Sequence, residues 1–217
     1  MAEWFAAIAE WFAAIKDDFI LNFIKDDRWK YLVNGLGVTL KITLVAVLMG
    51  IAIGVVVAIV RSTYDKNYSR MRKGAGRVLL GIFNAVAKVY LTVVRGTPVV
   101  VQLMIIYYII FSSSNNGVLI AMLAFGINSG AYVAEIIRSG IMSIDNGQFE
   151  AGRSLGFNYV QTMRYVIIPQ ALKNVLPALA NEFIVLLKDT SLITVIGGKE
   201  LLYAAQGIMN RTYEAMF

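Results

Sequence analysis

The 217-residue sequence contains no cysteine and no histidine. These absences exclude thiol nucleophiles, imidazole general bases, disulfide bridges and the usual zinc ligands. Charged residues are also scarce, at 16% of the chain, whereas hydrophobic residues account for 58%. This composition is too apolar for the surface of a soluble protein, so we expect most of the chain to lie in a membrane.

Further absences narrow the function. The net charge is +6, but the 20 basic residues are scattered among apolar runs and form no basic face interleaved with aromatics, so nucleic acid is not an expected partner. There is no G-x4-G-K-[ST] phosphate loop, so nucleotide is expected to bind another polypeptide. We therefore predict a protein that is not an enzyme, without catalytic residues, cofactor or metal of its own. The N-terminus lacks the pattern of a cleaved signal peptide, and the first membrane helix is expected to direct insertion.

Residues 1–34 are predicted to form an amphipathic segment at the membrane interface. The heptad Ala-Glu-Trp-Phe-Ala-Ala-Ile occurs twice in succession, at 2–8 and 9–15. At helical spacing its Trp, Phe and Ile side chains form an apolar stripe punctuated by charges, which favours a helix that lies in the interface over one that spans. The alternative is a partly ordered leader without a function of its own, because termini tolerate change.

Residues 35–217 are predicted to form one all-α transmembrane domain. The clearest span includes 42–60, nineteen residues without a charge, which is long enough to cross a hydrocarbon core of about 30 Å. Small residues recur at every fourth position along it and predict close packing against another helix. These small residues are Ala46, Gly50, Gly54 and Ala58. The four predicted spans cover about residues 40–60, 78–111, 117–141 and 174–197.

The distribution of charge indicates how these spans are oriented, and a helix-breaking sequence interrupts one of them. Residues 61–77 hold six basic residues against one acidic residue, which indicates a cytoplasmic loop and therefore an N-terminus outside. Within the second predicted span, the sequence Arg-Gly-Thr-Pro at 95–98 predicts an interruption of the helix.

Polar side chains inside the spans are candidates for a transport pathway. Ionisable groups are costly in a membrane and usually face a polar cavity or a partner. The hypothesis is that Glu182 meets the ammonium of a zwitterionic cargo and that Lys188 meets its carboxylate or a neighbouring subunit, with simple pairing between helices as the alternative. Gln102 and Asn128 complete the candidate pathway, although hydrogen-bonded helix packing is the favoured role of Asn128.

The segment 145–169 has the local chemistry of a short helix that docks on another protein. Asp145 or Asn146 can cap this helix, and Glu150 is expected close to its positive N-terminal end. Gly156 can end the helix in the left-handed conformation, and Pro169 is expected to stop the following segment before the next span. The candidate docking residues are Glu150, Ala151, Gly152, Ser154, Leu155 and Gly156. Among them, Ala151 and Gly152 are expected to present almost no side chain to a partner.

The spacing E-A-G-x3-G, followed twelve residues later by I-P, resembles the EAA loop of ABC-importer permeases. The string at 147–156, together with stretches at 95–102, 131–138 and 169–192, resembles the polar-amino-acid branch of that family, the histidine-, glutamine- and arginine-type permeases. The resemblance covers roughly residues 34–217. Gly152 stands where the family usually has Ala, a change that keeps the surface small but costs about 1 kcal/mol of helix propensity.

The resemblance implies a type I importer permease in a bacterial inner membrane, with a cytoplasmic coupling helix at 150–156 that docks on an ATPase. It implies four partners: a cytosolic nucleotide-binding subunit that holds ATP and Mg, a second permease subunit that is identical or a paralogue, an extracytoplasmic amino-acid-binding protein, and membrane lipid. Members of this branch continue after a segment like 212–217 into a fifth span, so a fifth span is expected beyond the sequence.

Two other classes of function stay open at the level of the sequence. An ion-driven carrier or channel without an ATPase would use Glu135, Glu182 and Lys188 as a charge relay, although no inverted repeats support it. A non-transporting assembly factor requires that a four-span chain be the native protein. For Glu135 and Arg138, three residues apart on a helix, a structural ion pair is the favoured interpretation.

Overall fold

The computed structural model describes residues 2–114 and 116–213, apart from the side chains of residues 2, 3 and 70. Over these residues it contains helices and no strand, which confirms the all-α prediction. Residues 214–217, after which the fifth span is expected, lie outside the described part. The α-helices are α1 (Ala2–Phe19), α2 (Trp29–Asn67), α3 (Ala75–Gly96), α4 (Val99–Ile105), α5 (Gly117–Met142), α6 (Asn146–Ser154), α7 (Tyr159–Thr162), α8 (Ile168–Asp189) and α9 (Leu201–Thr212). Short π-helical segments (Ile20–Ile24, Ile106–Ile110, Met163–Ile167) and 3₁₀ segments (Lys25–Asp27, Tyr68–Arg70, Thr190–Ile196) connect them.

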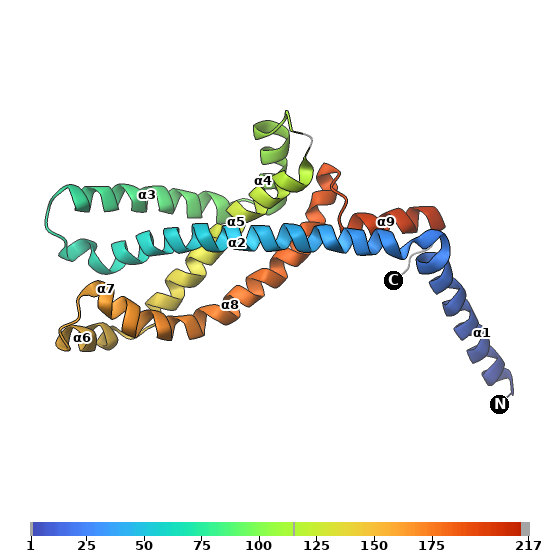
Figure 1. Cartoon of the computed structure of the whole chain (residues 1–217), viewed down its shortest axis with the longest axis horizontal. Coiled ribbons are helices and arrows are strands. Elements are labelled where there is room, and N and C mark those ends of the chain that lie inside the picture. Colours follow the sequence, from blue (N-terminus) through green and yellow to red (C-terminus); the bar gives the residue numbers. More distant parts are fainter. Residues whose placement is uncertain (1, 115, 214–217) are drawn as a thin grey trace.

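Helix α2 forms the axis of the molecule and packs along α5 (Figure 1). The stripe of small residues on α2 is buried, as predicted, and its members are Ala46, Gly50, Gly54 and Ala58. A Cβ atom added at Gly50 would lie 2.6 Å from Ser129 Oγ, and one added at Gly54 would lie 2.5 Å from Val133 Cγ1. Both distances are too short for any side chain larger than hydrogen, so the stripe sets how closely α2 and α5 approach.

Three helices, α2, α3 and α5, are long and apolar enough to cross a membrane. Helix α2 extends beyond the predicted 40–60 at both ends, because its polar flanks continue the helical hydrogen bonds without a Pro to stop them. The predicted span 78–111 is divided at Thr97 and Pro98 into α3 and the shorter α4, so the expected interruption is present. The fourth predicted span, 174–197, corresponds to most of α8 and the 3₁₀ segment after it, and it contains three charged residues, Glu182, Lys188 and Asp189.

The two ends of the molecule carry different elements (Figure 1). Helices α6 and α7 lie at the same end as the connection between α2 and α3. Helices α1 and α9 lie at the opposite end, beside the start of α2. The length of α2 therefore separates residues 145–169, which we call the docking loop, from α1, which is predicted to lie at the membrane interface.

Helix α1 projects away from the rest of the chain after a sharp turn (Figure 1). Asp26 and Asp27 both have φ of 56°, in the left-handed region that few residues adopt, and they separate α1 from α2. The buried Arg28 donates from Nη1 to the carbonyl oxygen of Leu21 at 2.8 Å and so braces this turn. The boundary predicted at residue 34 falls inside α2, so the separate N-terminal segment ends near residue 28.

Candidate docking loop and transport cavity

Helix α6 begins and ends as its sequence predicts. The Asp145 carboxylate caps its start by accepting a hydrogen bond from the backbone N–H of Gly147 at 2.6 Å. Gly156 closes its end with φ of +80°. There the N–H of Gly156 bonds to the carbonyl oxygen of Arg153 at 2.9 Å, and the N–H of Phe157 bonds to that of Gly152 at 3.0 Å. The helix is short but has stops at both ends, which gives it a defined shape.

The orientation of Gly152 differs from the expectation that it faces a partner. Gly152 is buried, and a Cβ atom added there would lie 2.7 Å from Cγ2 of Thr162. Ala151, one residue earlier and about 100° around the helix, is exposed and takes the outward position. Gly152 therefore allows α6 to approach α7 instead of contributing to the outer surface.

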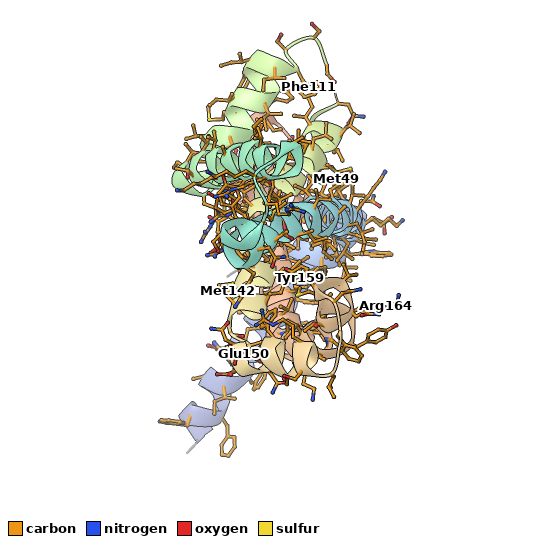
Figure 2. All side chains as sticks on the ribbon, turned by 90° about the vertical axis from the view of Figure 1, so that its left-hand side faces the viewer. Met49, Phe111, Met142, Glu150, Tyr159 and Arg164 are labelled. Atoms are coloured by element: carbon orange, nitrogen blue, oxygen red, sulfur yellow. The ribbon has the colours of Figure 1, made fainter. Side chains whose placement is uncertain are left out.

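The exposed surface of the docking loop combines one charge with large apolar groups. Glu150, Ser154 and Leu155 are exposed, and the side chains of Leu155 and Val160 have 73% and 70% of their area open. Glu150 is the fifth residue of α6, beyond the first turn, so the expected stabilisation by the helix dipole is wrong for this position. Glu150 forms no ion pair with any residue in the described ranges, and it lies on the end face of the molecule (Figure 2).

Pro169 does not stop the segment after the docking loop. Helix α7, the π-helical segment Met163–Ile167 and α8 follow one another without a break, and Pro169 is the second residue of α8. Pro169 stands just after the π-helical segment, where it removes one backbone N–H without ending the helical path. Gln170 donates from Nε2 to the carbonyl oxygen of Val166 at 2.9 Å across this junction. The loop is therefore joined to α8 by continuous helical backbone.

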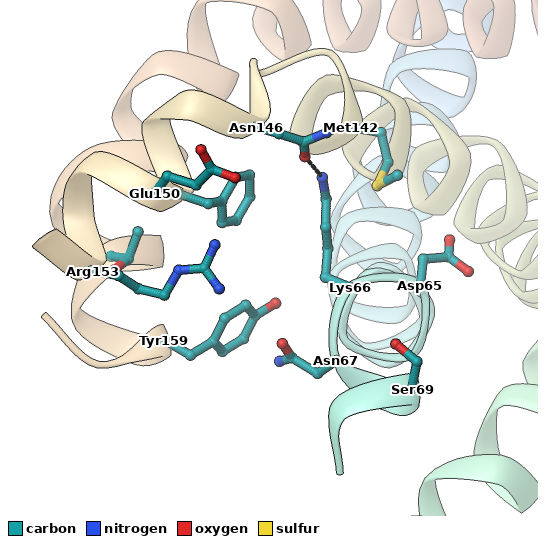
Figure 3. Close-up of a pocket in the computed structure, with 11 residues that line it drawn as sticks. Asp65, Lys66, Asn67, Ser69, Met142, Asn146, Glu150, Arg153 and Tyr159 are labelled. Carbon is teal, nitrogen blue, oxygen red and sulfur yellow. Dashed lines mark hydrogen bonds between the residues drawn. The ribbon is translucent and has the colours of Figure 1, made fainter.

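A pocket of about 540 Å³ separates α6 and α7 from the end of α2 (Figure 3). Lys66 of α2 crosses it, donating from Nζ to Asn146 Oδ1 at 2.7 Å and lying 4.6 Å from the centre of the Phe149 ring. Burial raises the pKa of the Tyr159 phenol in the same pocket, against the opposing effect of a side-chain hydrogen bond with Thr63, so this tyrosine is neutral at physiological pH. Lys66 thus ties the loop to α2.

A second cavity, of about 530 Å³, lies where the helix is interrupted after α3. We call it the transport cavity because two of the predicted pathway residues, Asn128 and Glu182, line it. Its polar lining comes from α3, α5 and α8 and from the interruption itself, and includes Arg95, Thr97, Asn128, Tyr132, Glu182 and Asp189. One guanidinium and two carboxylates therefore face the same space.

Two of the predicted pathway residues line the transport cavity, and a third supports the residues around it. Glu182 and Asn128 line the transport cavity, whereas Gln102 stands behind it. Gln102 donates from Nε2 to the carbonyl oxygens of Val94 at 2.7 Å and Thr97 at 2.9 Å, two groups released by the interruption. Its Oε1 accepts from Asn128 Nδ2 at 3.2 Å. Gln102 therefore holds the interrupted backbone and orients Asn128.

Lys188 is not brought to the transport cavity. It is exposed and does not line the cavity, while Asp189 beside it does. Asp189 follows Glu182 by seven residues, two turns along the same helix face, and this spacing was available in the sequence. Arg95, the last charged residue before the interruption, supplies the cation that Lys188 was expected to supply. The sequence feature that could have identified Arg95 as a cavity residue is its position next to a helix break.

The fold and these sites define a class: a helical membrane permease with a polar cavity between its helices and a capped helical loop exposed at one end. The comparison with protein families agrees. Residues 74–216 match the family described as binding-protein-dependent transport system inner membrane component, and the chain belongs to this family. The predicted relation to ABC-importer permeases is thereby confirmed.

Individual relatives refine this assignment. The chain is similar to the glutamine transport system permease protein GlnP of Escherichia coli (strain K12), at 44% identity over 139 residues that cover 62% of this chain and 64% of GlnP. The match thus spans less than two thirds of that relative. A crystal structure of an amino acid ABC transporter with histidines matches with a TM-score of 0.72 and 42% identity over 85% of this chain and 80% of the other. An inward-facing structure of the MetNI methionine ABC transporter matches with a TM-score of 0.69 at 20% identity, over 88% and 86% of the two chains, and supports the fold alone.

Proposed function

We propose that the chain is a membrane-spanning permease subunit of an ATP-driven importer of polar amino acids. The observation that carries this proposal is the docking loop: a helix with stops at both ends, exposed Leu155 and Val160, and an unpaired Glu150 at one end of a family permease. An apolar surface around a lone charge is suited to burial by a partner protein. The partner is a cytosolic nucleotide-binding subunit that holds ATP and Mg.

The transport cavity supports an amino acid as cargo. A guanidinium at Arg95 binds a carboxylate through paired N–H donors, and the carboxylates of Glu182 and Asp189 bind an ammonium. A free amino acid carries both charges on neighbouring atoms, so the cavity complements its common part. The amide and hydroxyl groups of Asn128 and Tyr132 then suit a polar side chain.

The assembly around the permease follows from this function. A second permease subunit, identical or a paralogue, completes the pathway, and an extracytoplasmic binding protein delivers the cargo at the end that carries α1 and α9. The N-terminus is outside and the docking loop is cytoplasmic, in a bacterial inner membrane. The four-span arrangement and a further span beyond the sequence belong to the same proposal.

Reconstitution tests the function. The permease, its nucleotide-binding subunit and its binding protein are placed in proteoliposomes, and uptake of radiolabelled glutamine and histidine is measured with ATP supplied to the nucleotide-binding side. We expect uptake that needs ATP and both partners, and that is lost in Arg95→Ala. Uptake by the permease alone, driven by a sodium or proton gradient, would instead support the carrier class with its relay of Glu135, Glu182 and Lys188.

A second experiment tests the loop. Leu155→Asp places a charge in the apolar part of the proposed interface and is expected to abolish co-purification with the nucleotide-binding subunit. Tyr203→Asp, at an aromatic site on α9 at the other end that is 42% exposed against 73% for Leu155, is the control and is expected to leave co-purification intact. Retained binding in the loop variant would contradict the docking role.

A further inference from the structure

A ladder of alternating charges runs through three helices between the transport cavity and the docking loop. Arg95 of α3 lies 3.8 Å from Glu135 of α5, measured from Nη1 to Oε2. Glu135 lies 2.7 Å from Arg138, which confirms the predicted ion pair on α5. Arg138 in turn lies 3.0 Å from Asp65 of α2. We call these four residues the charge ladder.

The two ends of the charge ladder lie at the two sites. Arg95 lines the transport cavity, and Asp65 lines the pocket under the docking loop. The residue after Asp65 is Lys66, which holds Asn146 at the first turn of α6 (Figure 3). Three ion pairs, the peptide link from Asp65 to Lys66 and one hydrogen bond therefore connect the transport cavity to α6.

The unequal distances indicate which contact can yield. The pair between Arg138 and Glu135 has two hydrogen bonds, at 2.7 and 3.3 Å, whereas the contact from Arg95 to Glu135 is longer and the Arg95 side chain is 42% exposed. A carboxylate of cargo that reaches Arg95 competes with Glu135 for the same guanidinium. Glu135 is then held by Arg138 alone, and this changes how Arg138 divides its donors between Glu135 and Asp65.

We propose that Glu135, Arg138 and Asp65 are positioning residues that report occupation of the transport cavity to the docking loop. The inference rests on the proposed function, because it takes the cargo carboxylate and the ATPase as given. Cargo on Arg95 changes the pairing of Arg138 with Asp65, and through the backbone that joins Asp65 to Lys66 it changes the hold of Lys66 on Asn146 of α6. Because coupling between two sites is reciprocal, movement of α6 by the ATPase changes the availability of Arg95 in the same way.

The test uses the complete complex in nanodiscs and measures ATP hydrolysis with and without cargo-loaded binding protein. The ratio of stimulated to basal hydrolysis is the readout, because a merely structural change lowers both rates together. In Glu135→Gln and Asp65→Asn we expect this ratio to fall by about tenfold, within the range typical of coupling between sites. The double variant is expected to lose no more than either single one, because each change breaks the same ladder.

A matched control removes an ion pair outside the ladder. Asp27→Asn breaks the exposed 2.6 Å pair with Lys30 near α1 and is expected to keep the wild-type ratio. If Glu135→Gln or Asp65→Asn does not assemble into the complex, Arg138→Lys is tested instead. This variant keeps the positive charge but lacks the guanidinium that bridges two carboxylates, so the ratio of stimulated to basal hydrolysis is again expected to fall. A wild-type ratio in the assembled ladder variants would overturn the inference. A wild-type complex without cargo stimulation would instead overturn the proposed function.

Discussion

At the scale of single residues, Gly152 is explained by its neighbour and not by helix propensity. Ala would favour the helix by about 1 kcal/mol, but its Cβ would lie 2.7 Å from Thr162, and such overpacking typically costs about 1–3 kcal/mol. We therefore expect Gly152→Ala to lower the unfolding temperature of the purified permease. The double variant Gly152→Ala with Thr162→Ala removes the clash and is expected to be more stable than Gly152→Ala alone. A higher unfolding temperature for Gly152→Ala than for the wild type would show that helix propensity outweighs the clash with Thr162.

Gln102 makes a second prediction at this scale. Gln102→Leu keeps roughly the size of the side chain but leaves the carbonyl oxygens of Val94 and Thr97 without this donor. The partly buried Val94 oxygen left unpaired costs about 1–3 kcal/mol. We expect a lower unfolding temperature and weaker cargo binding, because Asn128 loses its acceptor as well. Gln206→Leu on the exposed side of α9 is the control, and an equal loss in both variants would contradict the role of Gln102.

These residues also show what the sequence can disclose. The cap at Asp145 and the left-handed end at Gly156 depend on chemistry within a few residues, so both were predicted correctly. The contact of Gly152 with Thr162 and the pairing of Arg138 with Asp65 depend on which helices meet. No local pattern contains that information, and Lys188 was consequently preferred to Arg95 as the cation of the pathway.

At the scale of elements, α1 is predicted to lie in the membrane interface. Trp4, Phe5, Trp11 and Phe12 are 61–77% exposed and fall on one face of the helix at 100° per residue. An apolar face of this kind is stable when it is buried at the boundary between headgroups and acyl chains. In nanodiscs of zwitterionic phosphatidylcholine, bromine placed near the headgroups is expected to quench Trp4 and Trp11. The variant with both changed to Ser retains Trp29 as the reference. If this variant loses the same absolute fluorescence intensity to bromine as the wild type, Trp4 and Trp11 are not quenched and α1 lies outside the interface.

The elements differ in how far the sequence determined them. Charge-free length identified α2 and α5, because a bilayer requires it, whereas α3 was expected as part of the longer predicted span 78–111. The interruption at Gly-Thr-Pro was predicted correctly because proline breaks helices. The ends of helices were less predictable. Helix α2 extends past its apolar core because no Pro interrupts its backbone hydrogen bonds. The chain also stays helical through Pro169, which stands just after the π-helical segment Met163–Ile167.

At the scale of the whole molecule, the docking loop and α9 are expected on opposite sides of the membrane. The end of α2 and the start of α3 carry the basic residues that the positive-inside rule predicts to be cytoplasmic, and α6 lies at that end (Figure 1). The chain has no cysteine, so single cysteines introduced into it are the only thiols that react. Ser154→Cys on α6 and Asn210→Cys on α9 are both at exposed positions and serve as controls for each other. A membrane-impermeant maleimide added to intact spheroplasts is expected to label Asn210→Cys, and the same reagent added to inverted vesicles is expected to label Ser154→Cys. Labelling of both from one side would contradict a chain that places its cargo entrance and its ATPase-facing loop across the bilayer from each other.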